Sequence, residues 1–264
     1  MRDSNLTLFQ LAFERGADPN RQSGPNKETA LHMCAKMTEG ELGQPLAQLF
    51  LEHGADPNLA AADGITPYAA AVREGNATVA DLLLAHGATP DTASPEDRFI
   101  GACRRVDRDT AWSVLRSHPN IVKAIDADSA RLLDHATVRN QLSAVKLMAE
   151  LGFDLAAFGN RGASQLHLAA WHGHADMVRF LVDLHVPINV RDTVYGTSPL
   201  AWAAHGSSSS KNWRDADDDY CAIVETLIKA GASYEAARNR WGVGPEEIAS
   251  ERVAALLRSN KQGL

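Results

Sequence analysis

The pentapeptide Gly-Ala-Asp-Pro-Asn occupies positions 16–20 and recurs at 54–58, with related versions at 87–91 and 231–233. Each copy follows a run rich in leucine and other apolar residues. Glycine accepts the left-handed backbone conformation that ends a helix, and Asp-Pro-Asn opens a turn. A helix stop that recurs in this way indicates one supersecondary unit repeated along the chain, which is typical of a solenoid.

The spacing between the stops gives the length of the unit. Gly54 lies 38 residues after Gly16, and Gly87 lies 33 residues after Gly54. Weaker stops at Gly152 and His185 are also 33 residues apart. A Thr or Ser caps the first turn of a helix, and Pro fits its first position. Variants of one such helix-starting phrase, rich in alanine, keep the same rhythm at 29–32, 66–69, 165–170 and 198–203.

These features resemble the ankyrin repeat family, which has a period of about 33 residues and a T-P-L-H-x-A signature. The resemblance covers almost the whole chain. It implies about seven to eight repeats of a bacterial type. It implies an all-α ankyrin-repeat solenoid of stacked helix-turn-helix units, joined by short β-turn or hairpin connections. The resemblance is specific for the fold and nearly silent on the function.

The period divides residues 1–264, taken as a single solenoid, into successive units. One of them is overlong, because His185 and Gly231 are 46 residues apart, 13 more than the period. The surplus lies at 206–219, between the two helices of its unit. The units are a partial one at 3–20, full ones at 21–58, 59–91, 161–192 and 193–235, degenerate ones at 92–125 and 126–160, and a C-terminal cap at 236–264.

The insertion at 206–219 has two interpretations. Insertions in repeat proteins map to loops on one face, which is often the binding face. A long insertion also costs little closure entropy, so a surface loop without a function is equally acceptable. Trp213 favours a function, because an aromatic residue in a polar loop packs back onto the solenoid or contacts a partner.

Composition limits the classes of function. The net charge of -7 and the isoelectric point of about 5.8 argue against nucleic-acid or membrane-surface binding. No apolar run approaches the roughly 18 residues that span a membrane, and the N-terminus lacks the pattern of a signal peptide. The three cysteines have no metal-binding or disulfide spacing, so we expect free thiols in a cytoplasmic protein.

The family resemblance also implies which side chains face the concave groove. In ankyrin repeats these are the two residues after the alanine pair of each first helix. Arginine suits carboxylate or phosphate groups, and Trp, Tyr and Arg dominate binding hot spots. The alternative is solvated arginines and a Trp packed between repeats. The predicted groove residues are Arg73, Arg104, Arg105, Arg139, Trp171, His172 and His205, with Tyr195 and Trp202 nearby and Trp213 on the insertion.

Signals for chemistry are weaker. His32 and His167 occupy the His position of the family signature, where histidine bonds neighbouring loops together. The His172-Gly173-His174 run lacks a third ligand at tight spacing, so we predict no metal site. No hydrolase, zincin or kinase motif is present in the sequence, and we expect no cofactor.

Two hypotheses for the function follow. The first is a non-catalytic, monomeric scaffold that binds another protein or an extended peptide in the groove, with acidic groups on the partner as one option. A nucleic-acid or membrane partner is not expected. The alternative is a small-molecule-binding protein or enzyme, with a groove pocket roofed by 206–219. In that case His172 or His205 would be the acid or base, and Arg104 or Arg139 would hold an anion.

Overall fold

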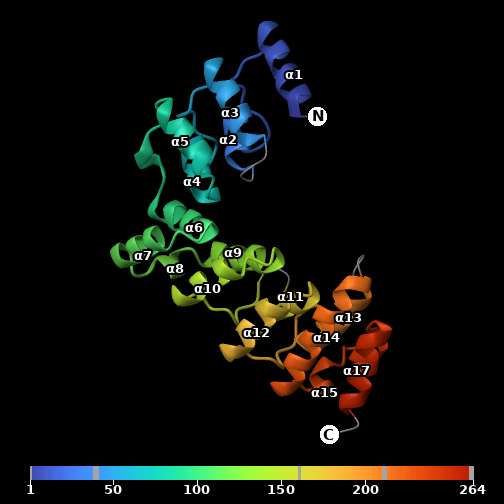
Figure 1. Ribbon diagram of the computed structural model, residues 1–264. Helices are drawn as coiled ribbons and strands as arrows, with labels where there is room; N and C mark the ends of the chain where they lie inside the picture. Colours follow the sequence, from blue (N-terminus) through green and yellow to red (C-terminus); the bar gives the residue numbers. More distant parts are fainter. Residues whose placement is uncertain (1, 38–41, 160–161, 210–212, 262–264) are drawn as a thin grey trace. The chain divides into compact units, whose positions relative to one another are not determined.

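The structure is a computed structural model that describes residues 2–37, 42–159, 162–209 and 213–261. The chain packs as two compact units, an N-terminal one, Met1–Ala124, and a C-terminal one, Ile125–Leu264. Each unit consists of paired helices joined by short loops (Figure 1). The predicted all-α fold of stacked ankyrin units is therefore confirmed, while the division into the predicted repeats and their continuity as one solenoid stay predictions.

In the N-terminal unit a single helix precedes three helix pairs. The first helices of successive pairs pack on one another, and so do the second helices α3 and α5. The elements are α1 (Arg2–Glu14), α2 (Ala30–Ala35), α3 (Gly43–Glu52), α4 (Pro67–Glu74), α5 (Ala77–Ala85), α6 (Pro95–Arg105), α7 (Arg108–Ser117) and α8 (Ile121–Ala124), with a 3-10 turn at Pro90–Thr92.

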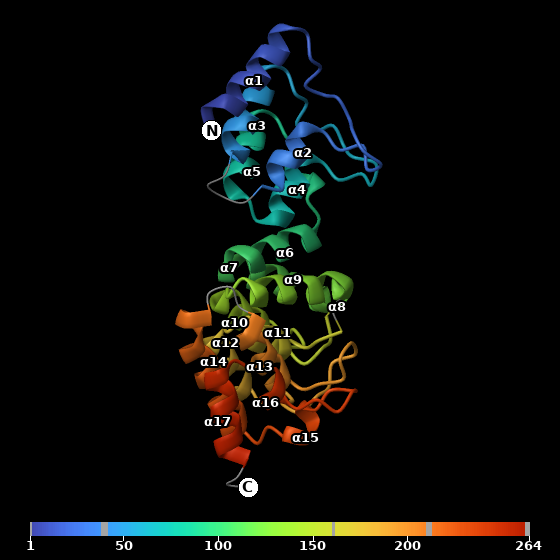
Figure 2. The same ribbon diagram turned by 90° about the vertical axis from the view of Figure 1, so that its right-hand side faces the viewer.

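The C-terminal unit has the same two layers. The helices α9, α11, α13 and α16 pack in order as one layer, and α12, α14 and α17 pack as the other. Figure 2 shows the loops before α11, α13 and α16 extending to one side of this unit. The elements are α9 (Asp126–Val138), α10 (Leu142–Glu150), α11 (Gln165–Trp171), α12 (Ala175–Asp183), α13 (Pro199–Ser209), α14 (Trp213–Lys229), α15 (Tyr234–Ala237), α16 (Pro245–Ile248) and α17 (Glu251–Lys261).

The repeated pentapeptide both ends a helix and joins neighbouring units. Gly54 has a φ of +86°, the left-handed conformation that its position requires. The Asn20 side chain donates to the Gly54 carbonyl at 3.0 Å and accepts from the Asp56 amide at 2.7 Å. Asn58 and Asn189 bridge to the following stops in the same way. Each of these three asparagines therefore fixes the next helix end, which explains why asparagine recurs at the end of the string.

The prediction that 206–219 forms a loop is wrong for the described residues. Helix α13 continues to Ser209, and α14 begins at Trp213. The acidic run 215–219 lies in the first turns of α14, where the helix dipole favours negative charge. Ser208 donates to the Ile248 carbonyl at 2.7 Å, and Ser250 donates to Asp217 at 2.8 Å. The surplus residues therefore lengthen two helices that bond to the C-terminal cap.

None of the described helices is both long enough and apolar enough to cross a membrane.

Candidate functional site

The aromatic residues predicted for the groove line one pocket of the C-terminal unit. Trp171 ends α11, Trp202 and His205 lie on α13, and Tyr195 precedes α13 in the connecting loop. They surround a pocket of about 170 Å³. The structure thus brings together four of the predicted residues. The rest of the lining is Thr197, Ala201, Asn239, Trp241 and Ile248.

The packing of α11 on α13 explains why these rings meet. The alanines that precede Trp171 and His205 are fully buried, so the two helices approach closely. The Trp171 ring lies 5.7 Å from the Trp202 ring and 4.8 Å from the His205 ring, both edge to face. Such contacts stabilise aromatic pairs beyond the area that they bury. The floor of the pocket is therefore held by ring-to-ring contacts between two neighbouring repeats.

Asp192 holds the loop side of the pocket in place. The residue is 3% exposed, and its carboxylate accepts from the Trp202 indole N–H at 3.1 Å. It also accepts from the backbone amides of Val194, Tyr195 and Thr197 and from the Thr197 hydroxyl. Burial raises the pKa of Asp192, but these hydrogen bonds outweigh it and hold the pKa below 3.8. The carboxylate is thus an ionised anchor for two pocket residues.

His167 has the structural role expected from its place in the family signature. Its ring is fully buried and 5.4 Å from the Trp202 ring. Its Nδ1 accepts from the Ser164 amide at 3.2 Å, and its Nε2–H donates to the Thr197 carbonyl at 3.0 Å. His32 makes the equivalent bonds to Thr29 and Ile65. Each histidine therefore joins one helix start to the next loop.

Burial makes the stability of the C-terminal unit depend on pH through His167. Desolvation lowers the pKa of its imidazole below 6.5. Because the unfolded chain then binds a proton that the folded chain excludes, the free energy of unfolding should fall as pH drops below about 6.5. The loss should stay below about 1.4 kcal/mol per pH unit, which is the limit for a single proton. Urea unfolding across this range measures it, and a His167→Gln variant that kept the same pH dependence would contradict the assignment.

Trp241 is the largest of the pocket residues that the sequence did not reveal, which also include Thr197, Ala201, Asn239 and Ile248. The sequence pattern indicates only that it belongs to the hairpin before the last helix. Its side chain is 67% exposed, and its amide donates to Asn239 Oδ1 at 3.0 Å. An exposed Trp in a hairpin is a signal that could have been used, because Trp is enriched at hot spots. Only the structure shows that this hairpin lies beside Trp202 and Tyr195.

The predicted residue His172 does not line the pocket. His172 stacks on His174 with ring centres 5.7 Å apart, and His174 bonds to the Val138 carbonyl at 3.1 Å. Trp213 begins α14, and its side chain lies outside the described residues. The described part of the 206–219 insertion contributes no lining residue to the pocket.

Three of the four predicted basic residues of the groove have acidic neighbours. Arg73 pairs with Asp97 at 2.8 Å, Arg104 pairs with Glu74 at 2.9 Å, and Arg105 pairs with Asp107 at 3.1 Å. Arg139 is exposed at the C-terminal end of α9. Since adjacent helices or turns supply the carboxylates, the positive charge of the first three arginines is largely offset within the N-terminal unit.

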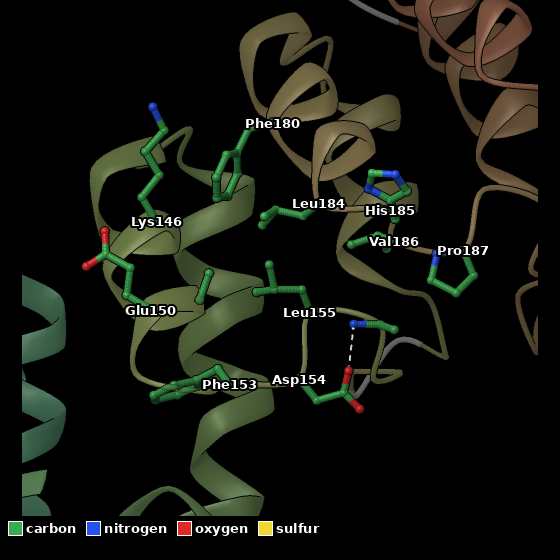
Figure 3. A pocket seen from close by; sticks show the side chains of 12 residues that line it. Lys146, Glu150, Phe153, Asp154, Leu155, Phe180, Leu184, His185, Val186 and Pro187 are labelled. Atoms are coloured by element: carbon green, nitrogen blue, oxygen red, sulfur yellow. Dashed lines mark hydrogen bonds between the residues drawn. The ribbon is translucent and has the colours of Figure 1, made fainter.

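The C-terminal unit has a second pocket, formed by second helices of its repeats and the loops that follow them. It has a volume of about 550 Å³ and lies between α10 and α12, which belong to successive helix pairs. Phe180, Leu184 and Leu155 point into the space between the two helices, while Lys146 and Glu150 lie at its α10 edge (Figure 3). The Lys146 ammonium lies 5.5 Å from the centre of the Phe180 ring. No sequence motif indicated this pocket.

No three His, Cys, Asp or Glu side chains come close enough to hold a metal ion in the part of the chain that the structure describes.

Comparison with known proteins identifies the family. The model for ankyrin repeats in three copies matches residues 1–94 and 102–238. The match covers well over half of the sequence, and the chain belongs to the ankyrin repeat family. The ankyrin repeat domain of Bcl-3, a member of the IkappaB protein family, is 24% identical, with a TM-score of 0.53 over 88% of this chain and 99% of that chain. This likeness supports the fold.

Curated relatives resemble parts of the chain. The ARF GTPase-activating protein Git of Drosophila melanogaster is 32% identical over 155 residues, which are 59% of this chain and 20% of that protein. Regulatory protein NPR6 of Arabidopsis thaliana is 31% identical over 114 residues, 43% of this chain and 22% of that protein. Protein PhlB of Serratia liquefaciens is 40% identical over 72 residues, 27% of this chain and 32% of that protein. The chain thus spans a third or less of each relative.

Proposed function

We propose that this chain is a non-catalytic scaffold that binds an extended segment of a partner protein on its C-terminal unit. An apolar side chain of that segment enters the pocket formed by Trp171, Tyr195, Trp202, His205 and Trp241. Ankyrin repeats generally bind other proteins, which gives the class of function. The observation that carries the proposal is the 67% exposed Trp241 beside this aromatic pocket, because exposed apolar surface of this kind marks interaction sites.

The size of the pocket favours a side chain over a complete small molecule. Sites for small molecules have volumes of roughly 300–1,000 Å³, whereas this pocket has about 170 Å³. An extended segment can place one side chain in such a pocket and run along the adjacent loops. Trp and Tyr at the centre of an interface typically supply most of its binding energy.

The chemistry of the pocket favours binding over catalysis. His205 is the histidine that lines it, and its ring contacts the Trp171 ring. Within the described residues His205 forms no side-chain hydrogen bond to a second polar group. General acid-base catalysis normally relies on such an oriented partner. We therefore assign His205 to the binding surface.

We also propose a cytoplasmic, monomeric protein, and the cysteines support the first of these two properties. Cys34 and Cys103 are buried free thiols, and burial raises the pKa of each thiol to about 12. Free thiols are typical of a reducing compartment.

Trp241→Ala is expected to abolish most of the binding without unfolding the protein. Peptides selected from a displayed random library on the unmodified chain provide the probe. Their affinity for Trp241→Ala should be about 30-fold weaker, since truncating a central Trp commonly costs 2 kcal/mol or more. Fluorescence anisotropy measures the affinity, and thermal unfolding should give the same Tm because the side chain is two-thirds exposed.

Phe158→Ala is the matched control. Phe158 is also a large exposed aromatic residue of the C-terminal unit, at 43%, but it does not line the pocket. Its replacement should leave the peptide affinity unchanged. The proposal is wrong if the library yields no peptide that binds the unmodified chain better than Trp241→Ala.

A further inference from the structure

Three arginines lie in the two loops that border the aromatic pocket. Arg191 lies in the loop that contains Tyr195, while Arg238 and Arg240 flank Asn239 in the hairpin that carries Trp241. The two loops are joined directly, because the Arg240 amide donates to the Tyr195 carbonyl at 3.2 Å. The arginines therefore form a basic rim, defined here as Arg191, Arg238 and Arg240, on the loop side of the pocket.

Backbone carbonyls hold the rim in place. Arg191 donates to the carbonyls of Gly196 at 3.1 Å, Arg238 at 3.3 Å and Glu235 at 2.6 Å. Arg240 donates to the Thr193 carbonyl at 3.1 Å, and its guanidinium lies 5.7 Å from the centre of the Trp241 ring. Arg238 donates to the Gly242 carbonyl at 2.5 Å. A carbonyl is a neutral acceptor, so these bonds fix the position of each guanidinium without neutralising its charge.

Nearby carboxylates compensate the rim only weakly. Arg238 lies 3.9 Å from Glu235, whose side chain is 82% exposed, and such surface pairs contribute little. Arg238 also helps to lower the pKa of Glu246, but that carboxylate is paired with Lys261 at 2.6 Å. Asp192 is buried behind Trp202, with both oxygens already accepting hydrogen bonds. In the described chain no carboxylate pairs with Arg191 or Arg240. This differs from Arg73, Arg104 and Arg105, each of which has an acidic neighbour.

The charge of the rim decides between two kinds of occupant. A pocket lined by Trp rings can accept an apolar side chain or a cation, because the face of an aromatic ring attracts positive charge. Three guanidinium groups at the edge repel a cation and attract a carboxylate, to which arginine can donate two parallel hydrogen bonds. We infer that the partner segment carries Asp or Glu residues next to the apolar side chain that fills the pocket.

The inference rests on the proposed function and is tested with the same peptide library. Peptides enriched on the unmodified chain, with Trp241→Ala used for counter-selection, should carry one bulky apolar residue flanked by Asp or Glu. Enrichment of the apolar residue without acidic neighbours, or with Lys or Arg beside it, would overturn this inference and leave the proposed function standing. Failure to enrich any peptide against Trp241→Ala would instead overturn the proposed function.

Charge variants of Arg240 isolate the electrostatic contribution. Arg240 suits the test because, among the residues that the structure describes, its side chain donates one hydrogen bond, to Thr193. Arg240→Glu should weaken an enriched acidic peptide about 10-fold in low salt, with a smaller difference in high salt as screening increases. Arg240→Lys keeps the charge and should retain most of the affinity. Equal binding by all three proteins, at equal Tm, would contradict an electrostatic role for the rim.

Discussion

Replacing Gly101 by alanine is expected to destabilise the N-terminal unit by about 3 kcal/mol or more. Gly101 lies inside α6, where that helix crosses α4. A Cβ at this position would overlap the carbonyl oxygen of Val72 and lie 3.0 Å from its carbonyl carbon. Because the obstacle is backbone, no change of rotamer relieves the overlap. The two first helices would have to separate and lose their packing, which urea unfolding would detect.

The sign of the effect makes this prediction specific. Within an isolated helix, alanine is more stable than glycine by roughly 0.5–1 kcal/mol. Helix propensity alone therefore predicts that Gly101→Ala stabilises the protein, whereas the packing of α6 on α4 predicts a large loss. Hydrogen exchange should locate the loss in α4 and α6. An unchanged or raised free energy of unfolding would show that these helices do not approach as closely as the structure indicates.

Asp192→Ala is expected to cost about 3–4 kcal/mol and to disrupt the pocket as well. The change leaves the buried Thr197 amide, the amides of Val194 and Tyr195 and the Trp202 indole N–H without their common acceptor. Unsatisfied buried donors cost about 1–3 kcal/mol each. Since Tyr195 and Trp202 both depend on this carboxylate, peptide affinity should fall together with the Tm. Thermal unfolding and anisotropy measure the two effects.

Asp154→Ala is the control for Asp192→Ala. Asp154 is an exposed aspartate of the same unit and accepts from the Ala156 amide, so its loss should cost well under 1 kcal/mol. Equal losses of stability in Asp192→Ala and Asp154→Ala would contradict the anchoring role of Asp192.

The pH dependence of the free energy of unfolding provides a second test of Asp192. Because the pKa of Asp192 is held below 3.8 in the folded chain, its contribution is complete above that value and disappears as pH falls through the lower folded pKa.

The aromatic part of the candidate site could be predicted because it follows the repeat. Trp171 and His205 occupy the same position after the alanine pair of successive first helices, so aligning the repeats places them side by side. Trp202 lies one turn from His205 on the same helix. The structure confirms that these rings lie together. Their role in binding a partner stays a proposal.

The charged part of the site could not be read in the same way. Aligning the repeats placed arginines after the small residues, but it gave no information on the carboxylates that approach Arg73, Arg104 and Arg105 from other helices and turns. The basic rim lies in loops instead. Its position depends on hydrogen bonds between the loop at 191–197 and the hairpin at 238–242, which are more than 40 residues apart in the sequence.

The sequence by itself determined the ankyrin family, the helix stops and the order of the helices. These features are local, because glycine conformation, capping residues and apolar periodicity act within one unit. The tertiary structure decided that the surplus at 206–219 lengthens two helices, that Asp192 anchors Trp202 and that Trp241 borders the pocket. These features depend on which side chains from different repeats come within a few ångströms, and a repeat pattern does not contain that information.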